Sequence, residues 1–310
     1  MHAVVIVVVA LAVLVALILG TLAAFGRRFR SHLRRHPGFT PPAVPPAPIE
    51  PIRYASPEDP VLGEFRETYD LESVAGSGSE MERLTRLLGW VHGLTTHARN
   101  PSRPNRMNGL HLAGLAIAEG KRFNCWMYAT VMNDACLALG FASRIVHLWP
   151  HKEHPNESHV VTCVYSRDLA KWVMLDPDMC AYVADGAGVP LGVDEIRRRL
   201  VRGEPLRIAN TIQLAYASWL GRPLLKRLYA WYLSKNIFRY DAPARSEPDY
   251  ETRKSGRVYF HLIPDGYHDE WLATPRVTAR GNTIHYLRDP EVFWRPPATG
   301  PDGIAGDSVD

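Results

Sequence analysis

The 310-residue sequence predicts an α+β fold, and its pattern of apolar residues supports this class in two ways. In residues 79–94 and 125–139, apolar side chains recur every three or four positions, which is typical of helices that pack on a core. Short β-branched runs bounded by turn residues follow in residues 142–175 and again in residues 257–287, which predicts strands. We therefore expect helices ahead of a sheet, with further helices and strands after it.

The predicted helices have clear start signals. Ser79 and Glu82 have the spacing of a capping box, in which each side chain accepts the other residue's backbone N–H. A second helix is expected over residues 108–119. A third, mostly buried helix is expected over residues 125–139, because apolar residues occur around its whole circumference and Gly140 follows as a stop signal.

Cys125 opens the third helix. Asn124 is a favourable N-cap residue, which places Cys125 in the first turn. The unpaired backbone N–H groups and the helix dipole favour a thiolate there, and the same N–H groups can donate to an oxyanion. The alternative is that Cys125 is a small buried apolar residue, which is the expected role of Cys136 in the middle of the helix.

A histidine and an aspartate lie at the ends of neighbouring predicted strands. Three antiparallel strands are expected between residues 142 and 175, joined by polar turns. His159 begins the second strand and Asp176 follows the third, so both are expected at the same end of the sheet. The imidazole can then take the thiol proton of Cys125 while the carboxylate fixes its tautomer. The sequence thus predicts a Cys125–His159–Asp176 triad.

These residues and their surroundings resemble the transglutaminase-like superfamily, whose core is a papain-like fold. In that family a cysteine heads a helix, a Gly-x-x-Ser-Arg turn leads into a strand, a histidine begins the next strand, and a Trp-x-x-Leu-Asp-Pro segment ends the third. The resemblance covers about residues 80–205. The matching segments are Gly140-Phe141-Ala142-Ser143-Arg144, His159-Val160-Val161 and Trp172-Val173-Met174-Leu175-Asp176-Pro177.

The resemblance implies a role for each residue of the triad. Cys125 is the expected nucleophile, His159 the general base and acid, and Asp176 the residue that orients the histidine. The reactions of the family are acyl transfers from amides: transamidation, deamidation or peptide-bond hydrolysis. One departure is that Val160 and Val161 follow the histidine where the family often has an aromatic residue, which puts substrate handling near His159 in doubt.

We therefore predict thiol-dependent acyl transfer on protein or peptide amides, at a membrane and without a cofactor. Asn124 and Trp126 are further candidates for the oxyanion hole and the cleft, although Trp126 is equally suited to packing inside the helix layer. The competing hypothesis is a catalytically inactive domain that keeps the fold and binds a peptide or protein at the membrane.

A histidine cluster raises the alternative of a zinc site. Three of its members with a nearby cysteine would satisfy tetrahedral coordination. The spacing matches no compact zinc signature, so we expect no metal. Four cysteines in 310 residues also form no disulfide framework. The residues concerned are His147, His151, His154, His159 and Cys163.

The N-terminal segment predicts a membrane anchor. Residues 3–25 contain no charged residue, and as a helix they would be about 35 Å long, enough for a hydrocarbon core of about 30 Å. The basic residues that follow favour a single-pass topology with the rest of the chain in the cytoplasm, and contact with anionic lipid headgroups. These basic residues are Arg27, Arg28, Arg30, Arg34 and Arg35.

The charge distribution argues against a nucleic-acid partner. The chain carries a net charge of +4 and those five arginines alone contribute +5, so the remainder is about −1. No nucleic-acid-binding motif occurs elsewhere in the sequence.

Composition suggests five segments. A transmembrane helix is expected over residues 1–25, and a basic and proline-rich linker over residues 26–53. The catalytic core would cover residues 54–205. A helical and β extension would pack on it over residues 206–295, with two helices between residues 210 and 240 and strands after residue 257, and residues 296–310 would form a disordered tail.

Overall fold

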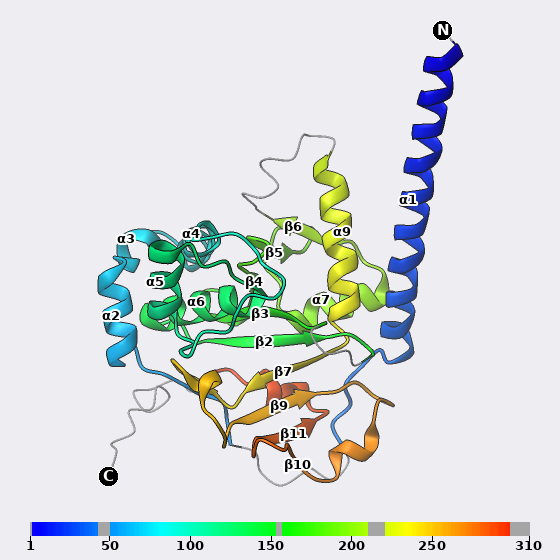
Figure 1. Cartoon of the computed structure of the whole chain (residues 1–310). Helices are drawn as coiled ribbons and strands as arrows, with labels where there is room; N and C mark the ends of the chain where they lie inside the picture. Colours follow the sequence, from blue (N-terminus) through cyan, green and yellow to red (C-terminus); the bar gives the residue numbers. More distant parts are fainter. Residues whose placement is uncertain (1, 43–49, 153–156, 210–220, 298–310) are drawn as a thin grey trace.

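A nine-stranded sheet runs through the centre of the computed structural model, which describes residues 2–42, 50–152, 157–209 and 221–297 (Figure 1). The order of its strands is β10-β11-β9-β7-β2-β3-β4-β5-β6. All neighbouring pairs are antiparallel except β11 and β9, which are parallel. The strands are β2 (Ser143–Trp149), β3 (His159–Ser166), β4 (Lys171–Asp176), β5 (Ala181–Ala184), β6 (Arg207–Ala209), β7 (Arg239–Pro243), β9 (Val258–Leu262), β10 (Arg276–Val277) and β11 (Thr283–Leu287).

Helices lie around this sheet, and a small parallel pair, β1 (Arg53–Tyr54) and β8 (Arg245–Ser246), joins the start of the domain to its C-terminal part. Two short 3-10 helices cover Tyr250–Thr252 and Asp269–Leu272. The α-helices are α1 (His2–Arg35), α2 (Pro60–Thr68), α3 (Leu71–Ala75), α4 (Glu80–Gly93), α5 (Gly109–Glu119), α6 (Cys125–Ala138), α7 (Val193–Arg202), α9 (Gly221–Asn236) and α10 (Pro290–Phe293). The mixed α+β class is therefore confirmed.

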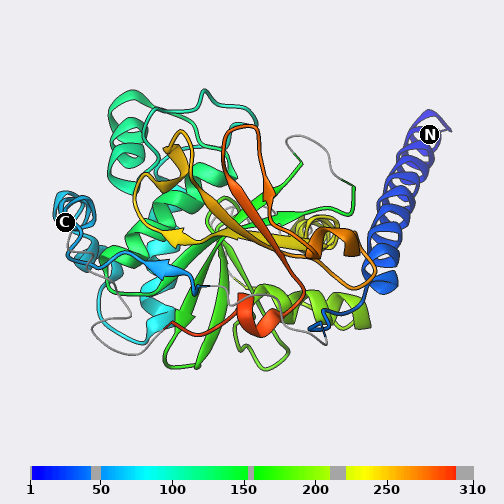
Figure 2. The same ribbon diagram turned by 90° about the horizontal axis from the view of Figure 1, so that it is seen from below.

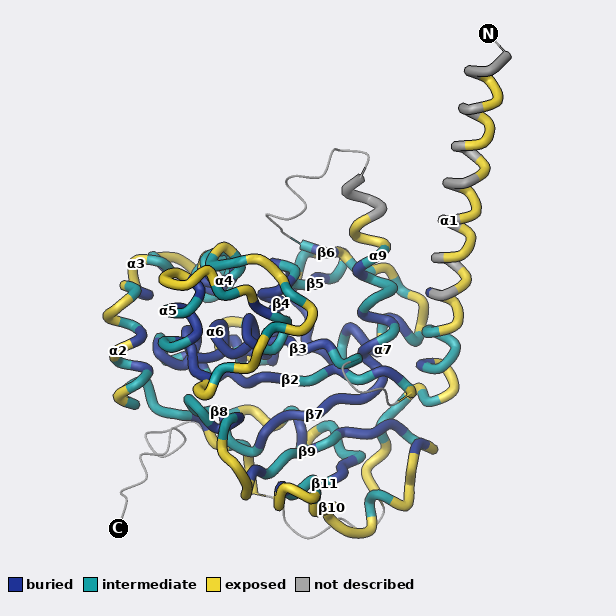
Figure 3. Tube along the Cα trace, viewed as in Figure 1, coloured by how far each residue is buried: buried dark blue, intermediate teal, exposed yellow. Residues whose placement is uncertain are grey.

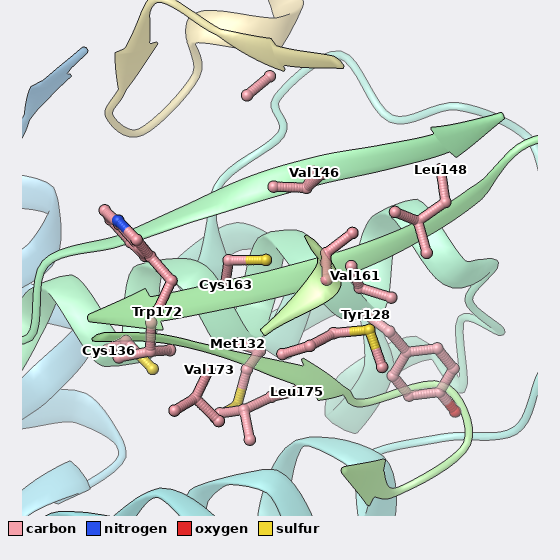
Figure 4. Packing of buried hydrophobic residues seen from close by; sticks show 14 of the residues in the cluster. Tyr128, Met132, Cys136, Val146, Leu148, Val161, Cys163, Trp172, Val173 and Leu175 are labelled. Atoms are coloured by element: carbon pink, nitrogen blue, oxygen red, sulfur yellow. The ribbon is translucent and has the colours of Figure 1, made fainter. Parts of the chain in front are cut away.

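Helix α6 is the central element of the core. Every residue from Met127 to Ala138 is buried, because the helix lies between the sheet and the helices α2, α4 and α5. Figure 4 shows Met132 of this helix beside Val173 and Leu175 of β4. Figure 3 shows the same concentration of buried residues in α6 and in the neighbouring strands.

The predicted helix starts are present in the structure. Ser79 and Glu82 form both hydrogen bonds of the capping box at the start of α4. Asn108 caps α5, and Asn124 caps α6 by accepting the backbone N–H of Met127 at 3.0 Å. Gly140 follows α6 with a φ of 77°, a left-handed conformation that suits a residue without a side chain.

The C-terminal strands extend the central sheet. The pair β2–β7 joins them to the core, and β9, β11 and β10 continue outward from β7 (Figure 2). The strands predicted after residue 257 therefore belong to the same sheet as the core strands. A turn around Gly281 connects β10 to β11.

The structure corrects the prediction for the N-terminus. Within the described residues, no helix combines the length and the apolar character needed to cross a bilayer, so the predicted single-pass membrane protein with a cytoplasmic domain is wrong. Helix α1 instead continues to Arg35, and its last turns pack on the body: Leu33 is fully buried, and Arg34 Nε donates to the Val201 carbonyl at 3.3 Å. The contact of the five arginines with anionic lipid headgroups stays a prediction.

Gly192 is the N-cap of α7, and the Glu195 side chain accepts the Gly192 backbone N–H at 2.8 Å. One further element prediction needs correction. The second helix expected up to residue 240 ends at Asn236, and β7 begins three residues later. Most of the first of those two expected helices, residues 210–220, lies outside the described residues, as does most of the expected tail, residues 298–310.

Candidate active site

Cys125, His159 and Asp176 come together from three elements. Cys125 is the first residue of α6, His159 the first of β3 and Asp176 the last of β4. His159 Nε2 donates to Asp176 Oδ2 at 2.6 Å, and both side chains are fully buried. Since Asp176 holds Nε2, Nδ1 is the ring atom left for the thiol.

The surroundings of His159 favour its charged form. Burial lowers the pKa of His159, but the negative charge of Asp176 outweighs it and holds that pKa well above the usual range. A protonated imidazole between a carboxylate and a thiol is the arrangement in which a thiolate is stabilised by an ion pair.

Asp176 accepts further hydrogen bonds from groups that were not predicted from the sequence. Tyr229 of α9 donates its O–H to Asp176 Oδ2 at 2.8 Å, and the backbone N–H of Met179 donates to Oδ1 at 3.1 Å. The ring of Tyr232 lies edge-on to His159, with 4.9 Å between the ring centroids. Both tyrosines lie in the second of the helices predicted between residues 210 and 240; their spacing of three residues, which places them on one helix face, was the available signal.

The start of α6 offers backbone donors beside the thiol. Because the Asn124 side chain accepts the Met127 N–H, the N–H groups of Cys125 and Trp126 are those at the helix start without an intrahelical acceptor. The guanidinium of Arg103 lies 4.5 Å from the centroid of the Trp126 ring. Trp126 Nε1 is buried and has no hydrogen-bond partner in the described part of the chain.

A cavity of about 680 Å³ opens in front of Cys125. Asn124 and Trp126 also line it, as does Tyr232 from α9. Val160 and Trp126 contribute apolar surface to the cavity, and polar residues of β7, β9 and the following segments contribute the rest of its lining. The thiol therefore lies at the edge of a space large enough for part of a peptide, with both apolar and polar lining.

The other cysteines contrast with Cys125. All four are thiols, and Cys125 alone is partly accessible, whereas Cys136, Cys163 and Cys180 are buried. Burial raises the pKa of Cys136, and it raises that of Cys163 to about 12. These thiols have the character of core residues.

The histidines of the zinc alternative lie in separate environments. No group of three histidine, cysteine or carboxylate side chains placed to hold a metal ion is found among the described residues, and His154 lies outside them. His151 stacks on His32, with 4.3 Å between the ring centroids, while His147 pairs with Asp241 and His159 with Asp176.

Comparison with known proteins connects this geometry to a family. Residues 67–177 match the core domain described as "Transglutaminase-like superfamily". Among solved structures, the chain is similar to one from Cytophaga hutchinsonii described as a "Putative Cysteine Protease", with 13% identity and a TM-score of 0.29. That similarity covers 49% of this chain and 52% of the other, so the chain spans about half the length of that protein. No curated protein matches the chain. The matched residues 67–177 contain Cys125, His159 and Asp176, so the similarity to the transglutaminase-like superfamily includes all three residues of the candidate site.

Proposed function

We propose that the protein catalyses thiol-dependent acyl transfer from amides, with Cys125 as nucleophile, His159 as acid and base, and Asp176 as the residue that positions His159. The transglutaminase-like domain supports a papain-like thiol enzyme. The observation that carries the proposal is the buried 2.6 Å contact between His159 and Asp176 directly beside a cysteine at a helix start.

The reaction begins when the Cys125 thiolate attacks the amide carbonyl carbon. A C–S bond forms, and the carbonyl electrons move to the oxygen, where the free N–H groups of the first turn of α6 stabilise the negative charge. Protonated His159 then gives its proton to the amide nitrogen, the C–N bond breaks, and an amine or ammonia leaves. The acyl group remains on Cys125 as a thioester.

The second half of the reaction releases the acyl group. His159 is now neutral and takes a proton from water or from an acceptor amine as that molecule attacks the thioester carbonyl. The C–S bond breaks, Cys125 leaves as a thiolate, and His159 is again protonated. Throughout both halves Asp176 holds Nε2, so that Nδ1 stays directed at the thiol and the reacting carbonyl.

The test is the pH dependence of alkylation by iodoacetamide at each cysteine of the full chain, read by peptide mass spectrometry. We expect Cys125 to react well below pH 7, and the three buried cysteines to react only when the protein unfolds. His159→Ala should abolish the advantage of Cys125. His111→Ala is the matched control, since His111 is a partly buried imidazole on α5 that does not line the cavity.

The opposite result is equally informative. If Cys125 reacts no faster than Cys136 at any pH, or if His159→Ala leaves its rate unchanged, the thiolate–imidazole pair does not exist and the acyl-transfer proposal fails. The domain would then be an inactive member of its superfamily, and a peptide-binding role would replace catalysis.

A further inference from the structure

A second imidazole–carboxylate pair lines the same cavity on the other side of Cys125. In the sheet, His147 of β2 is paired in register with Asp241 of β7, which is itself paired with His261 of β9. On its other side His147 is paired with Val160 of β3. Directly paired residues of a sheet share a face, so these four side chains form one row across it.

Helix α6 covers only the beginning of this row. Ala129 and Cys125 pack on Val160 and Ile145, and α6 begins at Cys125. Beyond that point the same face of the sheet is open to the cavity, where His147, Asp241 and His261 line it. The row therefore continues the floor of the cleft outward from the nucleophile.

Asp241 is enclosed by donors and holds His147 in one orientation. His147 Nδ1 lies 2.7 Å from Asp241 Oδ1, His261 Nε2 lies 3.4 Å from Oδ2, and Trp149 Nε1 also donates to Oδ2. Burial raises the pKa of Asp241, but the two histidines and these hydrogen bonds outweigh it and bring the value to about 2. The carboxylate is thus charged across the neutral range.

The charge of Asp241 decides what His147 presents to the cavity. Burial lowers the pKa of His147, but the charge and hydrogen bond of Asp241 outweigh it and raise the value to about 9. A neutral imidazole that donates Nδ1–H to Asp241 would present Nε2 as an acceptor. The protonated ring instead presents Nε2–H as a charged donor, and charged donors bind carboxylates best.

The carboxylates of Glu157 and Glu251, which also line the cavity, already have partners. Lys235 and Glu157 lie 3.0 Å apart, and Glu251 accepts the Tyr259 O–H at 3.1 Å. Arg99 is exposed at the cavity and adds a second positive charge. The carboxylates that face the cavity are therefore already engaged, whereas His147 keeps one donor for a ligand.

We propose that His147, charged and held by Asp241, binds a carboxylate of the acyl donor, so that the cleft prefers amides with an acidic group close to the scissile bond. This inference rests on the proposed function, because it assigns a substrate class to the cleft of Cys125. His147 would be a specificity-determining residue, and Asp241 a positioning residue that acts through it.

The test compares three alkylating reagents on Cys125 in the full chain: anionic iodoacetate, neutral iodoacetamide and cationic 2-bromoethylamine. In each reaction the thiolate forms an S–C bond and the halide leaves with the bonding electrons. We expect the ratio of the iodoacetate rate to the iodoacetamide rate to exceed that of glutathione. His147→Gln should lower this ratio about tenfold, the effect of losing one charged hydrogen bond. Because iodoacetamide reacts with the same thiolate, the ratio cancels any change in the charge state of Cys125.

Two variants and one control make the result decisive. His147→Lys should restore the preference for iodoacetate, because it returns a positive charge to the same position. Asp241→Asn keeps the shape but removes the charge that keeps His147 protonated, and it should lower the ratio as His147→Gln does. His285→Gln makes the same substitution as His147→Gln on β11, outside the cavity, and should change neither rate.

The two proposals fail in different ways. A low iodoacetamide rate at Cys125 in the unmodified protein contradicts the proposed function. Two results overturn the carboxylate site even if Cys125 is fully reactive. One is a ratio that is unchanged in both His147→Gln and Asp241→Asn, and the other is a larger enhancement over glutathione for 2-bromoethylamine than for iodoacetate.

Discussion

Replacing Tyr229 by phenylalanine tests how the buried end of the triad is held. Tyr229 O–H donates to Asp176 Oδ2 at 2.8 Å, and burial together with the charge of Asp176 holds the pKa of the phenol well above its usual range, so the phenol stays a donor. Tyr229→Phe removes this hydrogen bond and almost nothing else, because the ring remains.

The expected loss follows from the partners that remain. A hydrogen bond to a charged acceptor contributes about 1.5–3 kcal/mol. Asp176 Oδ2 keeps the His159 Nε2–H at 2.6 Å, and Oδ1 keeps the Met179 N–H, so no buried atom is left without a partner. We therefore expect the free energy of unfolding to fall by about 2 kcal/mol, which for a domain of this size lowers the Tm by about 4–8 °C.

The assay is urea unfolding followed by circular dichroism, with Tyr232→Phe as the matched control. The ring of Tyr232 packs on His159, and its O–H makes no hydrogen bond within the described residues, so its loss should cost less than about 0.5 kcal/mol. Equal losses in the two variants, or a stable Tyr229→Phe protein, would refute the view that Tyr229 holds the carboxylate.

Three further predictions concern the helix start, the second pair and the core. Asn124→Ala should cost about 1 kcal/mol in urea unfolding, because the Met127 N–H loses its acceptor, while Asn124→Asp should cost much less. The raised pKa of His147 means that its ion pair with Asp241 stabilises the fold fully below pH 6.5 and is lost as the pH rises through about 9. The free energy of unfolding should therefore fall over that window, and a flat profile, or the same slope in His147→Gln, would contradict the pairing. Arg144→Lys should lower the Tm in calorimetry, because the buried guanidinium, 4.3 Å from the Trp172 ring centroid, stacks in a way that an ammonium group does not.

Local patterns in the sequence were sufficient for the elements of the core. The caps at Ser79, Asn108 and Asn124 are short-range interactions, so residues three positions apart reveal them. The meeting of His159 and Asp176 was also predictable, since a tight turn between antiparallel strands brings the start of one strand near the end of the next. The placement of Cys125 beside them required the resemblance to a family, because nothing local determines how a helix packs on a sheet.

The prediction at the N-terminus failed because it concerned a tertiary contact, which local patterns do not determine. A run of apolar residues predicts burial, but it does not say which surface, if any, covers it. In the structure Val5, Ile6 and Leu17 of this run are exposed, and Leu33, the residue of α1 that lies in the core, follows the run. For the same reason the contact of Tyr229 with Asp176 was not predicted, because the helix of Tyr229 was predicted from composition alone.

The sequence by itself determined the helices, the core strands and the candidate nucleophile, because capping, periodicity and turn chemistry act over a few residues. Only the tertiary structure brought Tyr229 to Asp176 and Asp241 to His147, across 53 and 94 residues of chain. Contacts of that separation depend on the order of strands in the sheet and on where a later helix docks. Both are decided by the packing of the whole domain, and for that reason the second charged pair in the cleft was not predicted from the sequence.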